Sequence, residues 1–299
     1  MKILYAVSRD ETLTVRHAKS AYDNSIKDTF NLFILCLYAL VKIARVSTED
    51  AENRKAKYLP TEIDKKFKPT LYDNPIIQGI ESSVFFNKRV EKLQFSTKIT
   101  KDFCKNIYSE FLKEELYQTY ITSPKTDESH LDILLELFRF CRKSEFFNDV
   151  MEENYISWID DKSVVVGTVK KVLKGDTHAE DLFQQHLPDS QIVEDFGKNL
   201  LVYTFEEEDE LLDMIKPTLE NWDHERLAII DMILIKLAVI EFLNFETVPV
   251  KVSLNEYVDI SKIYSTPKSK EFVNGILDKL YKGLDEEGKI KKIGRGLLE

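Results

Sequence analysis

The stretch from Leu227 to Leu243 constrains the fold more than any other part of the sequence, because it is apolar on nearly every side of a helix. Such a helix lies either in the centre of a protein or in a membrane. Its 17 residues include Asp231, Lys236 and Glu241, which falls short of the ~20 uncharged positions of a typical membrane span. The pattern predicts a buried core helix.

The three charged residues of this helix predict contacts with other elements. At ~100° per residue, Asp231, Lys236 and Glu241 point in three directions, so they do not form one solvated face. An unpaired charge is too costly to bury. We therefore expect each of them to have its own partner. Asp223 is placed to be the N-cap of the helix.

Two more helix signals follow. Ser253 and Glu256 have the spacing of a capping box at the start of the first. Thr266 is a candidate N-cap for the second, with Pro267 in its first turn, and Gly283 is placed to end it. The sequence thus predicts three consecutive helices in its last third.

The last of these helices contains the unusual string Phe272-Val273-Asn274-Gly275. Gly275 lies in the helix interior, where glycine costs ~1 kcal/mol relative to alanine. A close approach of another helix would explain it, and we expect Asn274 to form a hydrogen bond across that contact. Asn255 is assigned a similar structural role, because a buried amide fixes the register of packed helices.

Together these residues resemble the C-terminal half of the NusB family of transcription antitermination factors. The residues that carry the resemblance are Pro217, Trp222, Arg226, Asp231, Ile233-Leu234, Ala238, Glu241, Pro249, Asn255-Glu256, Val258, Ser261-Lys262, Ser269, Phe272-Val273-Asn274-Gly275 and Leu277-Asp278. The resemblance covers roughly residues 191–283, and Met1 to Ala6 is similar to the second half of the family's first helix. It implies a long form of the family with a central insertion and a shortened N-terminus.

The remaining sequence is typical of an all-α protein. Nine glycines, eight prolines and the lack of alternating strand patterns favour long helices with short connections. We expect further helices over 26–44, 76–95, 99–120, 129–149 and 152–174. The predicted architecture is a helical bundle in which additional helices are inserted: residues 1–190 form an N-terminal helical region with the insertion, and residues 191–299 form a NusB-like domain.

Two further observations indicate the cellular compartment of the protein. The apolar stretch from Ile26 to Ala44 is flanked or interrupted by Asn31, Lys42 and Arg45, which favours a core helix over a membrane span. The three cysteines are far apart, form no CxxC pair and follow no secretory leader. We expect a cytoplasmic protein with reduced cysteines and no membrane contact.

Charge is unevenly distributed along the chain, whose net charge is -10. Lys and Arg number 13 against 9 Asp and Glu in residues 1–70, 17 against 30 in 71–220, and 12 against 13 in 221–299. This pattern assigns the acidity to the insertion. Lys262 to Arg295 holds nine basic and five acidic residues, and such a local patch can bind RNA despite the negative total.

No pattern of catalytic chemistry is found. The five histidines are scattered without an HExxH motif, and there is neither a Walker loop nor a GxGxxG string. Asp160-Asp161 and the group His178, Glu180 and Asp181 could be imagined as metal ligands, but such polar pairs are common on surfaces. The sequence predicts no catalytic residue, no cofactor and no metal.

The resemblance implies a non-catalytic antitermination factor. Members of the family pair with NusE, which is also a small-subunit ribosomal protein, and bind the boxA element of nascent RNA. The factor then acts with the transcription elongation complex, chiefly on ribosomal RNA operons. For the protein partner, the family uses faces of its first and central helices, which here nominates Tyr5 and Glu241.

Carried over by position, the RNA contacts fall on the turn before the last helix and on its first turn. They are Ser265, Thr266, Lys268, Ser269, Lys270 and Phe272, together with Lys2 near the N-terminus. Helix N-terminal N–H groups attract phosphate, lysines add charge and an exposed aromatic ring can stack on a base. The alternative is that Phe272 belongs to the core and Ser269 only caps the helix.

The start of the chain departs from the family pattern, in which the first helix opens with an arginine-rich segment. Here only Lys2, Arg9 and Arg16 remain. Either the start has been assigned too late, or RNA binding is weaker or transferred to the basic group Lys65, Lys66 and Lys68 and the C-terminal lysines. A protein-interaction module of the same fold without RNA binding is the main alternative. An accessory domain of an RNA methyltransferase is disfavoured, because no catalytic domain follows residue 283.

Overall fold

The fold was established from a computed structural model that describes residues 1–179, 181–219 and 228–298. Every regular element among them is helical and no strand is present there, so the all-α prediction is confirmed. The chain forms two compact units. Unit 1 comprises Met1–Asn24 and Pro188–Glu299, and unit 2 comprises Ser25–Leu187.

Unit 1 contains three major helices and several shorter ones. Its elements are α1 (Lys2–Arg9), the first turns of α2 (Val15–Lys55), the π-helical η2 (Gln191–Lys198), α12 (Asn199–Glu206), α13 (Glu208–Ile215), the short 3-10 helix η3 (Lys216–Leu219), α14 (Ile229–Asn244), α15 (Val250–Tyr264), α16 (Ser269–Glu286) and the 3-10 helix η5 (Gly294–Leu297).

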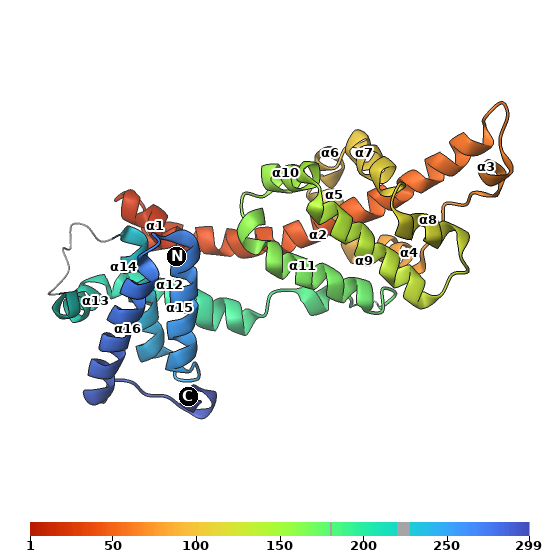
Figure 1. Cartoon of the computed structure of the whole chain (residues 1–299). Coiled ribbons are helices and arrows are strands. Elements are labelled where there is room, and N and C mark those ends of the chain that lie inside the picture. The colour runs from red at the N-terminus through yellow and green to blue at the C-terminus, as the bar shows by residue number, and fades with distance from the viewer. Residues whose placement is uncertain (180, 220–227, 299) are drawn as a thin grey trace. The chain divides into compact units, whose positions relative to one another are not determined.

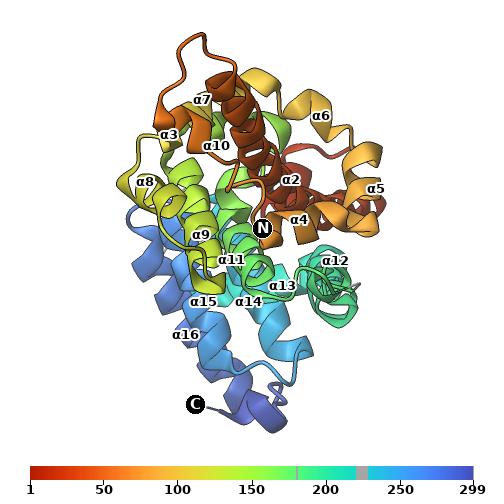
Figure 2. The same cartoon turned by 90° about the vertical axis from the view of Figure 1, so that its right-hand side faces the viewer.

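Helix α14 is the core of unit 1, as its sequence predicts. It packs against both α15 and α16, which also pack against each other (Figures 1 and 2). Residues 233–235 and 237–242 of α14 are all buried, and Val273 and Leu277 of α16 lie against them. An apolar helix surrounded on all sides is the solution that the hydrophobic effect favours for such a sequence.

The charged residues of α14 have separate partners, and this prediction is confirmed. Asp231 Oδ2 accepts a hydrogen bond from Ser269 of α16 at 2.7 Å. Lys236 Nζ lies 2.6 Å from Glu208 Oε1 of α13. Glu241 is bonded to α15, as described below.

Two segments far apart in the sequence build unit 1 together. Leu4 of α1 and Ala18 of α2 are buried in the same core as α14. The Tyr22 hydroxyl of α2 donates to the Val193 carbonyl at 3.0 Å. A Cβ on Gly197 would lie 2.0 Å from the Tyr22 hydroxyl oxygen, so only glycine allows this approach. Residues 1–24 therefore belong structurally with the C-terminal segment.

Several predicted helix ends are wrong. Helix α15 begins at Val250 with Pro249 as N-cap, so Ser253 lies inside the helix and does not cap it. Helix α16 begins at Ser269 and continues past Gly283 to Glu286. The left-handed residue after it is Gly288, with φ of +65°. The predicted N-cap Asp223 lies outside the described residues.

Unit 2 consists of the remainder of α2 and short helices packed around it. They are α3 (Glu62–Lys66), α4 (Pro75–Ser82), α5 (Val84–Lys92), α6 (Phe95–Lys98), α7 (Lys101–Phe111), α8 (Glu115–Thr122), α9 (Asp127–Lys143), α10 (Glu145–Asn154), α11 (Trp158–Lys174) and the short 3-10 helix η1 (Gln184–His186).

Local caps divide the long helices that the sequence predicts here. Ser83 accepts a hydrogen bond from Phe86 N and separates α4 from α5 within the predicted helix 76–95. Ser144 accepts one from Phe147 N and separates α9 from α10. Serine side chains accept hydrogen bonds from the free N–H groups at a helix start. A helix can therefore end and a new one begin within an apolar segment at little cost in free energy.

The predicted helix 26–44 is the centre of the much longer α2. By length and hydropathy α2 alone among the described helices could cross a membrane, with a mean hydropathy of 1.7 over its most apolar 18-residue window. That window is 78% buried inside the protein. Packing of residues 32–44 against rings and aliphatic side chains of unit 2 explains its composition.

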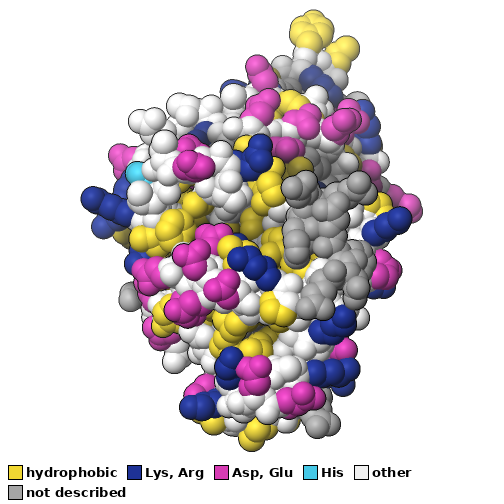
Figure 3. Space-filling view, turned by 90° about the vertical axis from the view of Figure 1, so that its left-hand side faces the viewer, with side chains coloured by type: hydrophobic (Ala, Val, Ile, Leu, Met, Phe, Trp, Pro, Cys, Tyr) yellow, Lys and Arg dark blue, Asp and Glu magenta, His cyan; other side chains and the backbone are white. Residues whose placement is uncertain are grey.

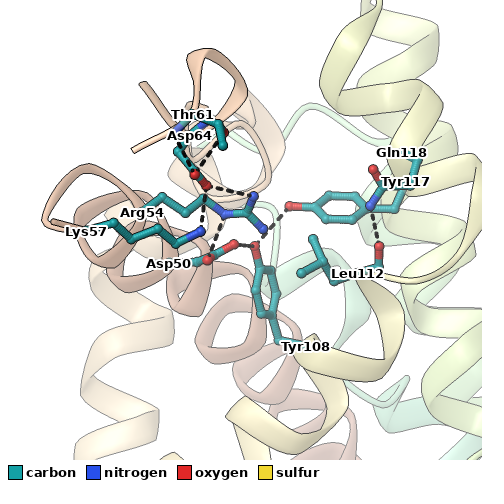
Figure 4. Close-up of polar contacts among 9 residues, drawn as sticks. All are labelled: Asp50, Arg54, Lys57, Thr61, Asp64, Tyr108, Leu112, Tyr117 and Gln118. Atoms are coloured by element: carbon teal, nitrogen blue, oxygen red, sulfur yellow. Dashed lines mark hydrogen bonds and ion pairs between the residues drawn. The ribbon is translucent and has the colours of Figure 1, made fainter. Parts of the chain in front are cut away.

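A polar network fixes the end of α2 and the loop after it (Figure 4). Asp64 accepts hydrogen bonds from Lys57 Nζ at 2.8 Å and from Thr61 Oγ1 at 2.8 Å. Arg54 bonds to Asp50 at 2.9 Å and stacks on Phe67 with 4.3 Å between guanidinium carbon and ring centroid. The loop between α2 and α3 is therefore held by several side chains at once.

All three cysteines are free and buried in unit 2. Burial raises the pKa of the Cys104 thiol to about 12 and raises the pKa of Cys36 and Cys141 as well. A thiol held neutral in an apolar core is unreactive. This agrees with the prediction that the cysteines are core residues.

Candidate nucleic-acid interface

The turn between α15 and α16 is organised around the Ser269 side chain. Ser269 Oγ is fully buried and lies 2.9 Å from Ser265 Oγ and 2.8 Å from Thr266 Oγ1. The Thr266 backbone N–H also donates to it at 3.2 Å. Three groups from two residues of the turn thus converge on one hydroxyl, which fixes the backbone from Ser265 to Ser269.

Asp231 anchors this turn to the core of unit 1. Its side chain is only 4% exposed, and its Oδ2 lies 2.7 Å from Ser269 Oγ. Its second oxygen, Oδ1, is buried without a hydrogen bond to any described residue. A carboxylate under the first turn of α16 offsets the positive end of the helix dipole from inside. Phosphate attraction at this corner must therefore come mainly from lysines.

Two lysines at the corner are exposed and free of ion pairs with any described residue. Lys268 precedes the first residue of α16 and Lys270 lies in its first turn. Thr266 is exposed beside them, and Ser265 is half-buried. On the face drawn in Figure 3, basic side chains are scattered singly, while several acidic side chains gather near the middle of one side. Contact with a polyanion therefore has to be local.

The structure brings Lys2 to the same turn, although it is distant in sequence. Lys2 Nζ lies 5.4 Å from the ring centroid of Tyr264, the last residue of α15. A cation over a tyrosine ring is a favourable contact. Lys2, Lys268 and Lys270 are thus carried by elements that meet at one corner of unit 1.

Phe272 is not the exposed aromatic that base stacking would require. It is only 7% exposed and belongs to the apolar core of unit 1. Ser269 is likewise buried, in the role of holding the turn. The prediction that these two side chains contact RNA is corrected, because a buried ring and a buried hydroxyl offer no surface to a ligand. The structure agrees with the alternative that the sequence left open.

Glu241 is also inside the protein. Its carboxylate accepts hydrogen bonds from Ser253 Oγ and from Tyr257 Oη, both at 2.6 Å, and its side chain is 6% exposed. Burial and the neighbouring carboxylate raise the pKa of Tyr257, so the phenol stays protonated and donates. This corrects the prediction that a protein partner contacts Glu241 directly: the residue joins α14 to α15.

The C-terminal tail is bound to the same end of α14. Lys292 Nζ donates to the carbonyls of Glu241 at 3.1 Å and Phe245 at 2.9 Å, which satisfies acceptors at the end of the helix. Burial lowers the pKa of Lys292. A Cβ on Gly296 would lie 1.9 Å from the Glu246 carbonyl oxygen, so the tail needs glycine there. Lys292 is therefore structural and is not part of an open basic surface.

Tyr5 is the residue of the predicted partner surface that remains accessible. It is 41% exposed on α1, while Leu4 beside it is buried in the core of unit 1. Helix α1 packs against α14. A tyrosine on a firmly packed helix is a suitable contact for a protein partner, because its ring carries a large contact area at low entropic cost.

The three structural assignments in the last two helices need correction. Asn255 and Asn274 are both exposed, and neither makes a side-chain hydrogen bond to another described residue. A Cβ on Gly275 would meet nothing within 4 Å, so no helix approaches it closely. Val273 and Leu277 point inward, whereas Asn274 and Gly275 lie on the outer face of α16, away from any helix contact.

No cluster of three or more His, Cys, Asp and Glu residues suited to a metal occurs in the described part of the chain. Asp161, considered as a ligand, accepts a hydrogen bond from Thr29 at 2.7 Å. Glu180, from the other group considered, lies outside the described residues. The corner of unit 1 offers exposed lysines on a turn of fixed geometry.

The sequence did not identify Ser253 and Tyr257 as the hydroxyls that join α15 to Glu241 of α14. Ser253, Tyr257 and Ser261 repeat at i, i+4 and i+8 on α15, and all three are buried. Small polar residues at helical spacing on an inward face were the available signal. Ser253 and Tyr257 bond to the Glu241 carboxylate of α14, whereas the Ser261 hydroxyl donates to the Val258 carbonyl of its own helix.

These features define an all-α protein in which two buried carboxylates of a central helix bond to hydroxyls of the next two helices, leaving a lysine-bearing turn exposed. The model of the NusB family matches residues 161–282. A protein of Bacillus pumilus named transcription antitermination protein NusB is 34% identical over 102 residues, which cover 34% of this chain and 78% of that protein. The chain belongs to the NusB family.

Two other relatives are more similar over shorter shares of their length. The NusB protein of Salinibacter ruber is 41% identical over 104 residues, 35% of this chain and 65% of the relative. That of Chloroherpeton thalassium is 49% identical over 80 residues, 27% of this chain and 38% of the relative. The chain thus spans less than two thirds of these two proteins. No solved structure matches the chain.

Proposed function

We propose that this protein is a non-catalytic transcription antitermination factor of the cytoplasm. It binds boxA-type RNA together with a NusE-type ribosomal protein and, within the transcription elongation complex, promotes ribosomal RNA transcription. The observation that carries the proposal is the pair Lys268 and Lys270, which are exposed and form no ion pair with a described residue, on a turn fixed by Ser269 and Asp231. Membership of a family whose relatives bear the name transcription antitermination protein supports it.

The RNA contact is proposed to be a small electrostatic site. Its members are the exposed residues Lys2, Thr266, Lys268 and Lys270 with the half-buried Ser265. Because the turn is fixed before binding, little ordering entropy is lost when RNA binds. Because no ring is exposed on α16 in this turn, phosphate contacts contribute more than base stacking.

The first test is RNA binding by the variant Lys268→Ala with Lys270→Ala. Loss of two phosphate contacts should weaken binding to boxA-like RNA and reduce the slope of log affinity against log salt by about 1.4, since each contact to a single strand contributes about 0.7. Fluorescence anisotropy over a salt series, with and without NusE, measures both quantities. We expect tighter binding when NusE is present.

The matched control removes two lysines elsewhere in unit 1. Lys279 lies nine residues after Lys270 on α16, ~13 Å along the helix, and Lys251 lies at the far end of α15. Both are exposed and form no ion pair with a described residue. Their double alanine variant removes the same total charge and should bind RNA almost normally. Equal losses in both variants would mean that only net charge matters, and the corner site would be rejected.

The partner surface is proposed to be the exposed side of α1. Tyr5→Ala should weaken binding of NusE while leaving RNA affinity in its absence unchanged. Because Tyr5 is 41% exposed, the substitution should have little effect on folding. Isothermal titration calorimetry with NusE measures the effect, and unchanged affinity would remove α1 from the interface.

One observation favours a second function. Two of the six residues first assigned to RNA around the turn, Ser269 and Phe272, are buried, which leaves a smaller site. A protein-interaction module that binds NusE without RNA would fit this. Binding of NusE by the protein with no measurable boxA affinity at low salt would favour this alternative. RNA binding lost only after substitution of Lys65, Lys66 and Lys68 would instead place the contact in unit 2.

A further inference from the structure

Unit 2 contains an open groove that no part of the proposed function uses. It lies along α8, α9 and α11, with a volume of about 580 Å³. Such a volume is within the ~300–1,000 Å³ of pockets that bind ligands. The groove is far larger than a packing defect, so its lining residues describe what it can bind.

The floor and one side of the groove are apolar. Leu116 and Tyr120 of α8, Pro124 of the following loop, and Ile133 and Leu135 of α9 line it. Leu116 is 57% exposed, an unusual position for a leucine on a helix that otherwise packs against α9. Burial of these groups against a partner would be favourable.

The other side of the groove is basic. Arg139 and Arg142 of α9 and Lys170 and Lys174 of α11 line it, with Asp132 and Glu136 as the acidic residues. Arg139 is neutralised by Glu136, to which its Nε donates at 2.7 Å. Arg142, Lys170 and Lys174 form no ion pair with any described residue. Once the Arg139–Glu136 pair is set aside, the groove therefore holds three cations, Arg142, Lys170 and Lys174, and one carboxylate, that of Asp132.

Arg142 provides an independent sign of a missing partner. Its Nε is buried and makes no hydrogen bond to a described residue. Its guanidinium carbon lies 5.4 Å from the ring centroid of Phe138, which holds the head group in place without satisfying its donors. A fixed guanidinium with unused N–H groups is suited to a carboxylate.

The groove does not suit RNA. Its single ring, Tyr120, is only 6% exposed. The Tyr120 hydroxyl is bonded to His130 at 2.8 Å, and Lys125 Nζ lies 4.5 Å from its ring centroid. No base could stack on a covered ring, and a sugar–phosphate chain would leave the aliphatic floor unfilled.

We propose that this groove binds an acidic amphipathic helical segment of a partner protein. Apolar side chains of the segment fill the floor between α8 and α9, and its carboxylates meet Arg142, Lys170 and Lys174. An amphipathic helix in an apolar groove with charges at the rim is a common mode of peptide recognition. The insertion then recruits a protein through unit 2, separately from the RNA corner of unit 1.

The test uses a defined probe and the full-length protein. The probe is a fluorescein-labelled helical peptide with leucines on one face and glutamates on the other, and anisotropy measures its binding. One comparison peptide replaces glutamate by lysine, and another replaces leucine by serine. We expect the first peptide to bind at least about tenfold more tightly than either comparison peptide, because both charge and apolar burial contribute. Equal binding of all three would overturn the proposal.

Variants locate the bound peptide. Lys170→Glu with Lys174→Glu should weaken binding about tenfold or more, and Leu116→Ser should weaken it without a charge change. The matched control is Lys171→Glu with Lys143→Glu, on the same two helices but outside the groove; both residues are exposed and should leave binding unchanged. Circular dichroism confirms folding of each variant. An effect of the control equal to that of the groove variant would reject the site.

Two other ligands test the assigned class. A single-stranded RNA or a medium-chain fatty acid is offered in competition with the labelled peptide. Groove-dependent binding of either one, with no binding of the acidic peptide, would overturn the proposal in favour of that ligand. Absence of competition by both, with peptide binding lost in the groove variants, supports it. RNA affinity at the corner of unit 1 remains a separate readout.

Discussion

The two units hold their helices together by different chemistry. In unit 1 the central helix α14 contains two buried carboxylates, Asp231 and Glu241, and hydroxyls of α15 and α16 bond to them. In unit 2 the buried centre of α2, residues 32–41, contains no charged residue. Its polar network lies at the end of the helix, around Asp50 and Arg54 (Figure 4).

Aromatic packing is extensive in unit 2, beside a few amide hydrogen bonds such as that from the buried Asn74 to the His130 carbonyl. Phe183 lies 5.9 Å from Phe85, 5.6 Å from Phe86 and 6.4 Å from Phe33 between ring centroids. Apolar side chains can exchange with one another if volume and pattern are kept, whereas a carboxylate–hydroxyl bond requires particular residue types. Residue identity is therefore more strongly constrained by structure in unit 1, which holds most of the residues that the family model matches.

The two units also differ in net charge. The sequence assigned the acidity to the insertion, but unit 1 is the more acidic unit. Unit 1 contains 18 Lys and Arg against 26 Asp and Glu, and unit 2 contains 24 against 26. The acidic residues between Pro188 and residue 220 belong to unit 1 and not to the insertion. The proposed RNA site therefore lies on the more acidic unit, and binding there would depend strongly on Lys268 and Lys270, which form no ion pair with a described residue.

The largest effect should come from breaking the aromatic packing of unit 2. Phe183→Ala removes a side chain that is 1% exposed and leaves a cavity among three rings, at an expected cost of about 3–5 kcal/mol. Hydrogen exchange resolved by peptide should show lost protection in unit 2 and normal protection in α14. The control Phe146→Ala, at a position 44% exposed, should cost far less. Loss of protection in both units would show that they unfold together.

The carboxylate bonds of unit 1 should show a smaller but specific effect. Tyr257→Phe leaves the buried Glu241 carboxylate with Ser253 as its remaining side-chain donor and should cost about 1–3 kcal/mol. In unit 2, Tyr117→Phe removes a hydroxyl that lies 3.4 Å from another tyrosine hydroxyl, and should cost less than about 1 kcal/mol. Urea denaturation of both variants gives the comparison. Similar costs would mean that the two units do not differ in this way.

The same contrast explains what the sequence could predict. Apolar periodicity identified α14 and α2 as core helices, because burial depends on composition and spacing. The spread of charge around α14 predicted three separate partners, which the structure contains. Helix ends were harder to predict. Ser253 has the spacing of a capping box, yet it lies inside α15 and its hydroxyl donates to Glu241.

At the candidate site, sequence located the turn but not the direction of each side chain. One residue along α16 rotates the side chain by ~100°, so Val273 is buried while Asn274 is exposed. A family motif marks which residues recur together and does not distinguish a buried position from a binding one. For this reason the sequence wrongly predicted that Phe272 contacts RNA and that Glu241 contacts a protein partner. The predicted RNA contacts Lys268 and Lys270, in contrast, do lie on the surface.

The smallest expected effect is a local pH dependence in unit 2. Hydrogen bonds from Lys57 and Thr61 lower the pKa of Asp64 to about 2. A carboxyl with a depressed folded-state pKa stabilises the folded loop above its unfolded value of ~3.9, and this contribution is lost as pH falls through about 2. The protection factors of amides in residues 56–68, which are corrected for the intrinsic pH dependence of exchange, should therefore fall between about pH 4 and pH 2.

Asp64→Asn is the matched variant, because the amide keeps the shape but cannot form the ion pair with Lys57. The loop should exchange faster at pH 5 in this variant and should lose most of the pH dependence. Helix α12 of unit 1 provides the internal reference, since its buried residues Leu201 and Val202 are apolar. An unchanged pH response in Asp64→Asn would show that other carboxylates of unit 2, such as Glu49 beside Lys101, control the loop.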